Sequence, residues 1–108
     1  MENTWKRNSL SWSQRFEGYF KYNLESGEEI AIKQSPENEP PQCVYDAAII
    51  LAEYIRLTHL PKILESKKPY NILEVGSGCG FSSIYLKKHS DENVNFVVTD
   101  VPNVCTLI

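Results

Sequence analysis

Apolar and polar residues alternate in two short stretches near the start of the chain. The first alternation runs through residues 16–24, Ser26-Gly27 interrupts it, and Ile30 and Ile32 resume it. A period of two is typical of a strand with one buried face, and two such strands joined by a short glycine-containing loop form a β-hairpin. The apolar positions on one face of the first predicted strand are Phe20, Tyr22 and Leu24.

The residues on either side of this predicted hairpin lack a regular period. Residues 1–15 are polar around the isolated Trp5 and Trp12, which predicts a loose or weakly docked terminus. Residues 35–41 are polar and punctuated by prolines, which is typical of a linker. We therefore expect residues 1–41 to form an N-terminal extension that precedes the main domain.

A longer apolar pattern from Asp46 to Leu60 has the length and composition of a helix. Asp46 is suited to the N-cap, and Pro61 is suited to the end of the helix. Apolar residues cover most of the circumference, which predicts that this helix is substantially buried. The basic residues 61–70 are expected to form a flexible approach to the next strand.

The most informative pattern lies in the last third of the chain. An apolar run ends in glycines, a helical period follows, and a second apolar run ends in Asp100. Asp100 stands twenty residues beyond Gly80, where a ribose-binding carboxylate follows one crossover helix in a nucleotide-binding βαβ unit. The expected elements are a strand at 71–75, a turn at Gly76, Gly78 and Gly80, a helix at 81–88, a loop at 89–93 and a strand at 94–99.

The glycine turn distinguishes between several classes of ligand. A dinucleotide-binding turn has the pattern G-x-G-x-x-G/A, whose third small residue lets the helix pack closely on the strand, but Phe81 occupies that position. A P-loop requires a Gly-Lys-Ser/Thr sequence, which the chain lacks. What remains is E-x-G-x-G-x-G, formed by Glu74, Gly76, Gly78 and Gly80. This pattern resembles motif I of the seven-strand methyltransferases that use S-adenosylmethionine (SAM), with a glycine-rich turn that binds no ligand as the alternative.

Two further segments make the resemblance more specific. Val44-Tyr-Asp-Ala-Ala48 precedes the predicted long helix, and Thr99-Asp-Val-Pro102 follows the second core strand. Together with motif I they resemble the protein-lysine methyltransferase branch of these enzymes, the methyltransferase-like 21 group. The resemblance implies an α/β fold, the N-terminal part of a Rossmann-like seven-strand methyltransferase domain preceded by a β-hairpin and a helix. It also implies SAM as the cofactor and the lysine side chain of a protein substrate as the methyl acceptor.

The acids at the ends of the two core strands are the first candidate ligands of the cofactor. Asp100 is expected to accept hydrogen bonds from the ribose hydroxyls, each worth about 1.5–3 kcal/mol, although Asp before Val-Pro is also typical of a turn. Glu74 is expected to hold the methionine ammonium directly or through water, with capping of the following helix as the alternative.

The glycine turn and an upstream aromatic residue complete the predicted site. Gly76, Ser77 and Gly78 are expected to wrap the cofactor, because glycine allows close approach and a helix start offers unpaired N–H groups. Tyr45 stands where the resembled family has Trp, and it is either a cofactor contact or a core aromatic residue. Cys79 lies near a helix N-terminus, where a thiol pKa can fall, but we expect a small loop residue and no nucleophile.

Charge and cysteine content argue against several other functions. The formal net charge is −3 and the basic residues are scattered, so no nucleic-acid partner is indicated. Cys43, Cys79 and Cys105 are odd in number and widely spaced, and His59 and His89 have no partner at ligand spacing, so neither disulfides nor a metal site are predicted. A reducing compartment, the cytoplasm, fits this pattern. The longest aliphatic run is too short to span a bilayer, so no membrane partner is expected.

The length of the chain bears on its completeness. A doubly wound sheet needs more than the two parallel strands that 108 residues supply here, so residues 42–108 are expected to be the first part of a SAM-binding domain. We expect an N-terminal fragment or truncated form, because the resembled family's later motif, which lines its lysine channel, would fall beyond Ile108. No catalytic residue is assigned. The alternative functions are a non-catalytic binding module and a small-molecule methyltransferase.

Overall fold

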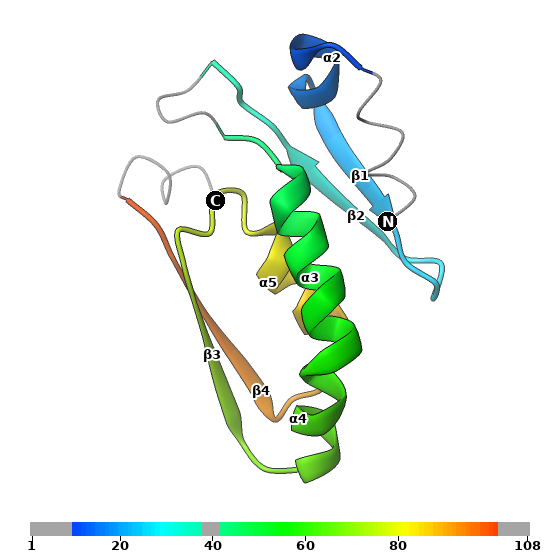
Figure 1. Cartoon of the computed structure of the whole chain (residues 1–108), viewed down its shortest axis with the longest axis vertical. Coiled ribbons are helices and arrows are strands. Elements are labelled where there is room, and N and C mark those ends of the chain that lie inside the picture. The colour runs from blue at the N-terminus through cyan, green and yellow to red at the C-terminus, as the bar shows by residue number, and fades with distance from the viewer. Residues whose placement is uncertain (1–9, 38–41, 102–108) are drawn as a thin grey trace.

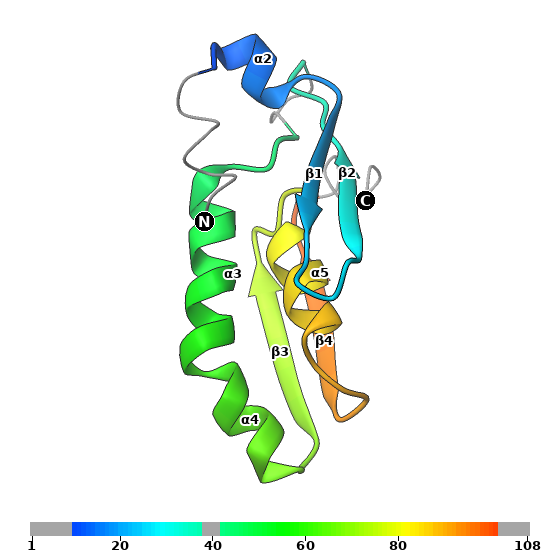
Figure 2. The same ribbon diagram turned by 90° about the vertical axis from the view of Figure 1, so that its right-hand side faces the viewer.

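The structure, a computed structural model, describes residues 10–37 and 42–101. Helix α5 (Phe81–Lys88) lies at its centre and contacts a long helical column, a β-hairpin and a two-stranded parallel sheet. The column is made of α3 (Asp46–Thr58) and α4 (Leu60–Ser66). Figure 1 shows it in front of α5, with the hairpin and the sheet on opposite sides. In Figure 2 the column runs along one side of the molecule. This arrangement agrees with the predicted α/β fold class. No helix in the described ranges is long and apolar enough to cross a bilayer.

The predicted β-hairpin is confirmed. β1 (Tyr19–Asn23) pairs antiparallel with β2 (Glu29–Lys33), and buried residues alternate with exposed ones in both strands. One face of the hairpin therefore packs on the core, as the period of two predicts. The buried residues are Phe20, Tyr22, Ile30 and Ile32.

A short helix, α2 (Trp12–Phe16), precedes the hairpin, where the sequence pattern predicted a loose terminus. The Ser11 hydroxyl accepts a hydrogen bond from the backbone N–H of Gln14, and the Gln14 side chain accepts one from the N–H of Ser11. This capping box satisfies two otherwise unpaired donors and stabilises the first turn. The prediction was wrong for residues 12–15 because a capping box defines a helix start without any apolar period.

The predicted helix at residues 46–60 is two helices, α3 (Asp46–Thr58) and α4 (Leu60–Ser66). Pro61 lies in the first turn of α4 instead of ending a helix, a position where its missing N–H removes no helical hydrogen bond. His59 joins the two helices with its backbone in the right-handed helical region. The predicted flexible approach to the first core strand is therefore wrong, because α4 occupies most of it.

The start of α3 also differs from the prediction by one residue. Tyr45 is the N-cap, without a side-chain capping bond, and Asp46 is the first helical residue. The predicted N-cap role of Asp46 is therefore wrong. An acid in the first turn still interacts favourably with the positive end of the helix dipole.

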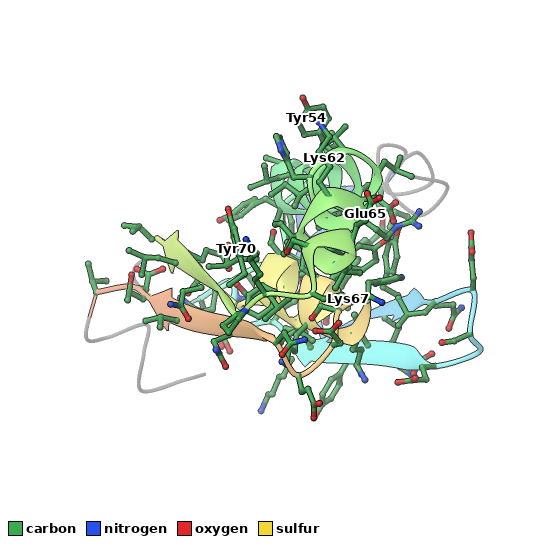
Figure 3. All side chains as sticks on the ribbon, turned by 90° about the horizontal axis from the view of Figure 1, so that it is seen from below. Tyr54, Lys62, Glu65, Lys67 and Tyr70 are labelled. Atoms are coloured by element: carbon green, nitrogen blue, oxygen red, sulfur yellow. The ribbon has the colours of Figure 1, made fainter. Side chains whose placement is uncertain are left out.

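Only one face of α3 is buried by the described elements. Ile49 and Ala52 lie in the core, whereas Leu51, Tyr54 and Leu57 are about half exposed or more. Figure 3 shows Tyr54 pointing away from the rest of the molecule. The predicted substantial burial of this helix is therefore wrong, because the described part of the chain covers one side of the helix alone.

The predicted βαβ unit is confirmed. β3 (Tyr70–Val75) and β4 (Val94–Thr99) pair in parallel, with Val75 opposite Thr99, and α5 connects them. The carboxyl ends of both strands meet at one edge of the sheet, next to the glycine turn. This is the edge at which open α/β sheets bind their ligands.

An aromatic cluster joins the hairpin to α5. The ring of Phe81 lies edge-to-face against Phe20 and Tyr22, with ring centroids 5.5 and 5.3 Å away, and Tyr85 lies 5.7 Å from Tyr22. Edge-to-face pairs contribute beyond their buried area. Phe81 therefore fills the space between helix and hairpin that a small residue at this position would leave open.

Glu53 of α3 adds polar contacts to this cluster. The hydroxyl groups of Tyr22 and Tyr85 donate to Glu53 Oε1 at 2.7 and 2.6 Å, and Arg56 Nη2 lies 3.1 Å from Oε2. Burial alone would raise the pKa of Glu53, but the hydrogen bonds from Tyr85, Tyr22 and Arg56 outweigh it, and the pKa is lowered. Burial, followed by the bond to Glu53, raises the pKa of both tyrosines. This network connects the hairpin, α3 and α5.

The linker between the hairpin and α3 is described at its two ends. Ser35 and Gln42 form an isolated antiparallel bridge, and the buried side chain of Gln34 accepts from the backbone N–H of Val44. The predicted domain boundary between residues 41 and 42 stays a prediction. Residues 1–9, 38–41 and 102–108 lie outside the described part, and with them Trp5, most of the predicted proline-rich linker, Pro102 and Cys105.

Candidate functional site

A pocket of about 640 Å³ is lined by residues of α3, β3 and α5 and by the glycine turn. Its volume falls within the usual range of small-molecule sites, about 300–1,000 Å³. The lining combines apolar side chains of α3 and β3 with polar groups of the turn and the first turn of α5. All six residues predicted from the sequence line this pocket: Tyr45, Glu74, Gly76, Ser77, Gly78 and Asp100.

Part of the pocket wall is apolar. Leu51 and Ile55 of α3 and Ile72 and Leu73 of β3 contribute to it. Leu51 and Leu73 are 49% and 63% exposed. Sequence reasoning assigned α3 to the core, because an apolar residue that lines a pocket has the same pattern as one that packs internally. Such a wall suits a ligand with a flat apolar part.

The backbone conformation of the turn requires glycine. Gly76, Gly78 and Gly80 have φ angles of 70°, 56° and 79°, a region that other residues occupy at a cost of about 1–2 kcal/mol. A Cβ atom added at Gly76 or Gly78 would meet no other atom within 4 Å beyond its chain neighbours. Both glycines therefore leave open space on the pocket wall, where a ligand can approach the backbone closely.

Ser77 links the turn to β4. Its backbone N–H donates to the carbonyl of Thr99 at 3.0 Å, and its carbonyl accepts from the N–H of Gly80 at 2.9 Å. Its side-chain Oγ is buried and makes no hydrogen bond with the residues that the structure describes. A buried polar atom without a partner costs about 1–3 kcal/mol. The Ser77 hydroxyl is thus a group that a polar ligand atom would satisfy.

Asp100 fastens the glycine turn to the end of β4. Its Oδ2 accepts from the N–H of Gly78 at 2.7 Å, and its Oδ1 accepts from the N–H of Val101 at 2.7 Å. The bond to Gly78 brings this acid to the predicted cofactor loop. A carboxylate offers about four acceptor positions and can accept several hydrogen bonds at once. The role of Asp100 as a ribose ligand stays a prediction.

The side chain of Glu74 is held by α5. Ser83 Oγ donates to Glu74 Oε1 at 2.5 Å, and Thr99 Oγ1 donates to the Glu74 carbonyl at 3.0 Å. Glu74 therefore contacts the following helix through a serine side chain. Ser82 and Ser83 are buried and line the pocket, but sequence reasoning missed them. The signal was a pair of hydroxyl residues in the first turn of a helix that opens directly after the glycines.

Tyr45 lies at the start of α3, on the pocket wall. The residue is 41% exposed, and its ring packs edge-to-face against Phe16 of α2, with centroids 5.3 Å apart. Burial, and then the neighbouring Cys43, raises the pKa of its hydroxyl group. Tyr45 is therefore a pocket residue and a packing residue at the same time.

Cys79 is a weakly acidic thiol within the turn. Burial, and then the neighbouring Cys43, raises the pKa of Cys79 to about 11. The fall in thiol pKa considered from the sequence does not occur, because burial disfavours the charged thiolate. The Sγ atom lies 4.0 Å from Oε1 of Gln42. These observations fit the predicted loop residue and not a nucleophile.

A comparison with protein families agrees with the geometry of this site. Residues 24–108 match the model of a family described as lysine methyltransferase. The comparison with curated proteins and the comparison with solved structures gave no match. The matched range contains all three segments that carry the resemblance: Val44–Ala48, motif I and Thr99–Pro102. The resemblance is therefore confirmed, and the chain belongs to the lysine methyltransferase family.

Proposed function

We propose that the pocket lined by α3, β3 and the glycine turn binds SAM, and that the protein transfers the SAM methyl group to a lysine side chain of a protein substrate. The observation that carries this proposal is the convergence of Glu74, the glycine turn and Asp100 on one pocket with an apolar wall. SAM has matching parts, since it combines a flat base, a ribose with two hydroxyls, and an ammonium close to a sulfonium.

The residues of the pocket fit such a ligand in charge and in space. Open space beside Gly76 and Gly78 allows close approach to the backbone. The carboxylates of Glu74 and Asp100 offer negative charge for the cationic groups and acceptors for the hydroxyls. The buried Ser77 hydroxyl, which has no hydrogen-bond partner in residues 10–37 and 42–101, offers one more polar contact.

The environment of Phe81 supports SAM over a dinucleotide. This side chain is 2% exposed and packs on the hairpin. A dinucleotide turn needs a small residue at this position for close packing of helix on strand. A bulky, buried ring there is compatible with an adenosyl amino acid held at the turn, and it argues against the pyrophosphate pattern.

The chain's own residues would contribute mainly alignment. When bound, SAM supplies a methyl group already activated on its sulfonium. Holding both reactants in the right geometry lowers a barrier by about 7–11 kcal/mol in well-oriented systems. Glu74 would hold the amino-acid end and Asp100 the ribose, while the hydrogen bond between Asp100 and Gly78 keeps the turn in place. The lysine amine must lose a proton before transfer, since its usual pKa is about 10.4.

Calorimetry tests the choice of ligand. Purified protein is expected to bind SAM and S-adenosylhomocysteine and to give no measurable heat of binding with NAD. Binding of NAD in preference to SAM, or no binding of SAM, would overturn the proposal.

A transfer assay tests the reaction itself. Labelled methyl groups from SAM are expected to appear on lysine residues of a protein mixture. Binding of SAM without any transfer would favour the alternative of a non-catalytic binding module. Label found only on small molecules would favour the small-molecule methyltransferase.

A further inference from the structure

Two adjacent serines in the first turn of α5 are equally buried but make different contacts. Ser82 and Ser83 are each 4% exposed, and both line the pocket. Ser82 Oγ donates to the backbone carbonyl of Ala48 in α3 at 2.9 Å. Ser83 Oγ donates to Oε1 of Glu74 at 2.5 Å. The first contact joins two helices, whereas the second reaches a carboxylate on the pocket wall.

The contact with Ser83 restricts the Glu74 side chain. A glutamate has several rotatable bonds, and fixing them on ligand binding costs conformational entropy. A hydrogen bond from a buried hydroxyl to an ionised carboxylate is short and strong, and here it fixes one of the two carboxylate oxygens. Oε2 makes no hydrogen bond within the described part of the chain. Ser83 therefore orders this carboxylate before a ligand arrives.

We propose that Ser83 is a positioning residue, whose hydroxyl orients Glu74 so that its carboxylate receives the ammonium group of the cofactor's amino-acid part. This inference rests on the proposed function, because it assumes that the pocket binds SAM. It predicts an effect limited to ligands that carry the ammonium group. Ser82 is the matched control, since it has the same residue type, burial and helix turn but no contact with Glu74 among its hydrogen bonds.

Two adenosine thioethers separate this role from a general effect on the fold. S-adenosylhomocysteine carries the ammonium and carboxylate, and 5′-methylthioadenosine has the same thioether-linked adenosine without them. Ser83→Ala is expected to weaken binding of S-adenosylhomocysteine roughly tenfold, as for one lost charge-assisted hydrogen bond, and to leave binding of 5′-methylthioadenosine unchanged. Ser82→Ala is expected to keep the wild-type ratio of the two affinities.

The outcomes separate a failure of this inference from a failure of the proposed function. If the wild type binds neither thioether, the SAM site is wrong, and the role of Ser83 is overturned with it. If the wild type binds S-adenosylhomocysteine and Ser83→Ala changes both affinities equally or not at all, only the positioning role is overturned.

Folding of each variant is checked by circular dichroism. Alanine is a strong helix former, so Ser83→Ala should keep α5 intact. Should it fail to fold, Ser83→Cys replaces it, because cysteine keeps a similar side-chain shape with a weak donor. Its affinities for the same two ligands are measured, and the same results support or overturn the positioning role. Ser83→Thr keeps the hydroxyl and is expected to retain the wild-type preference for the ammonium-bearing ligand.

Discussion

The hairpin side and the pocket side of α5 differ in how completely apolar side chains are buried and polar groups are hydrogen-bonded. On the hairpin side, Phe81 is buried and Glu53 accepts hydrogen bonds from two tyrosine hydroxyls. On the pocket side, Leu51 and Leu73 are exposed, and the buried Ser77 hydroxyl makes no hydrogen bond within the described part of the chain. The same helix therefore lies between a packed core, in which the Glu53 carboxylate is hydrogen-bonded, and a pocket surface with exposed apolar side chains and a hydroxyl that the described residues leave unpaired.

This difference indicates that the two sides contribute differently to stability and to binding. Strained backbone and unsatisfied groups at functional sites persist when packing elsewhere stabilises the fold. In this chain the aromatic cluster supplies that packing, and the buried Ser77 hydroxyl is a group that no hydrogen bond satisfies within the described residues. Substitutions on the hairpin side should therefore change stability first, and those on the pocket side should change ligand affinity first.

The largest effect is expected from Phe81→Ala on the hairpin side. It removes a buried ring that contacts Phe20 and Tyr22, and changes of this kind cost about 3–5 kcal/mol of folding stability. Denaturant unfolding followed by circular dichroism measures the loss. Ile84→Ala, at a position of the same helix that is 37% exposed, is the control and should cost clearly less. Equal losses would show that the aromatic cluster is not the main source of stability.

The next effect is expected from Asp100→Ala on the pocket side. Removing acceptors for two hydroxyls should weaken SAM binding by about 1.5–3 kcal/mol, or roughly tenfold to more than a hundredfold. Calorimetry measures the affinity, and Asp91→Ala in the exposed loop should change it little. Unchanged affinity in a folded Asp100→Ala protein would place the ribose elsewhere.

A deoxy ligand sharpens this prediction, because Asp100 also fastens Gly78. If Asp100 binds the ribose, the wild type should discriminate 5′-methylthioadenosine from its 2′-deoxy analogue, and Asp100→Ala should lose that discrimination. Equal discrimination by both proteins would mean that Asp100 acts only by ordering the turn.

A third prediction compares two glycines with positive φ. Gly78 lies on the pocket wall with φ 56°, and Gly27 lies in the hairpin turn with φ 94°; an added Cβ would meet no neighbouring atom within 4 Å at either position. Alanine at each should cost about 1–2 kcal/mol of stability, measured by thermal unfolding. Only Gly78→Ala should also weaken SAM binding, because its Cβ enters the pocket. A similar loss of affinity in Gly27→Ala would point to strain and not to the pocket.

The smallest effect concerns acid and the Glu53 network. The pKa of Glu53 is lowered in the folded protein from its ordinary value of 4.5. Its ionised form therefore adds stability that is present above that value and is lost as pH falls through the lower folded pKa. Glu53→Gln should cost about 1 kcal/mol at neutral pH, since charged hydrogen bonds become neutral ones.

Urea unfolding across the acidic range tests this network. Glu53→Gln should lose less stability than the wild type as the pH falls below 4.5. If both proteins lost stability equally on acidification, the acid sensitivity would come from other carboxylates.

The sequence by itself determined the βαβ unit, the hairpin and the family. A period of two places Phe20 and Ile32 on one buried face, and positive φ angles require glycine at positions such as Gly76 and Gly78. These are local requirements, met within a few residues of chain, so they can be predicted from the order of amino acids. Glu74 and Asp100, which line the pocket, were predicted as ligand residues because ligands of α/β folds bind where strands end.

The tertiary structure alone decided which groups meet. Glu53 receives hydroxyls from Tyr22 and Tyr85, which lie 31 and 32 residues away in the sequence, and the N–H of Gly78 meets Asp100, 22 residues away. The pattern of apolar residues in α3 likewise did not show which side of the helix is exposed. The physical reason is that periodicity defines which face of an element is apolar. The neighbour that covers that face, and the polar atom that satisfies each polar atom, depend on packing between elements that are distant in the chain.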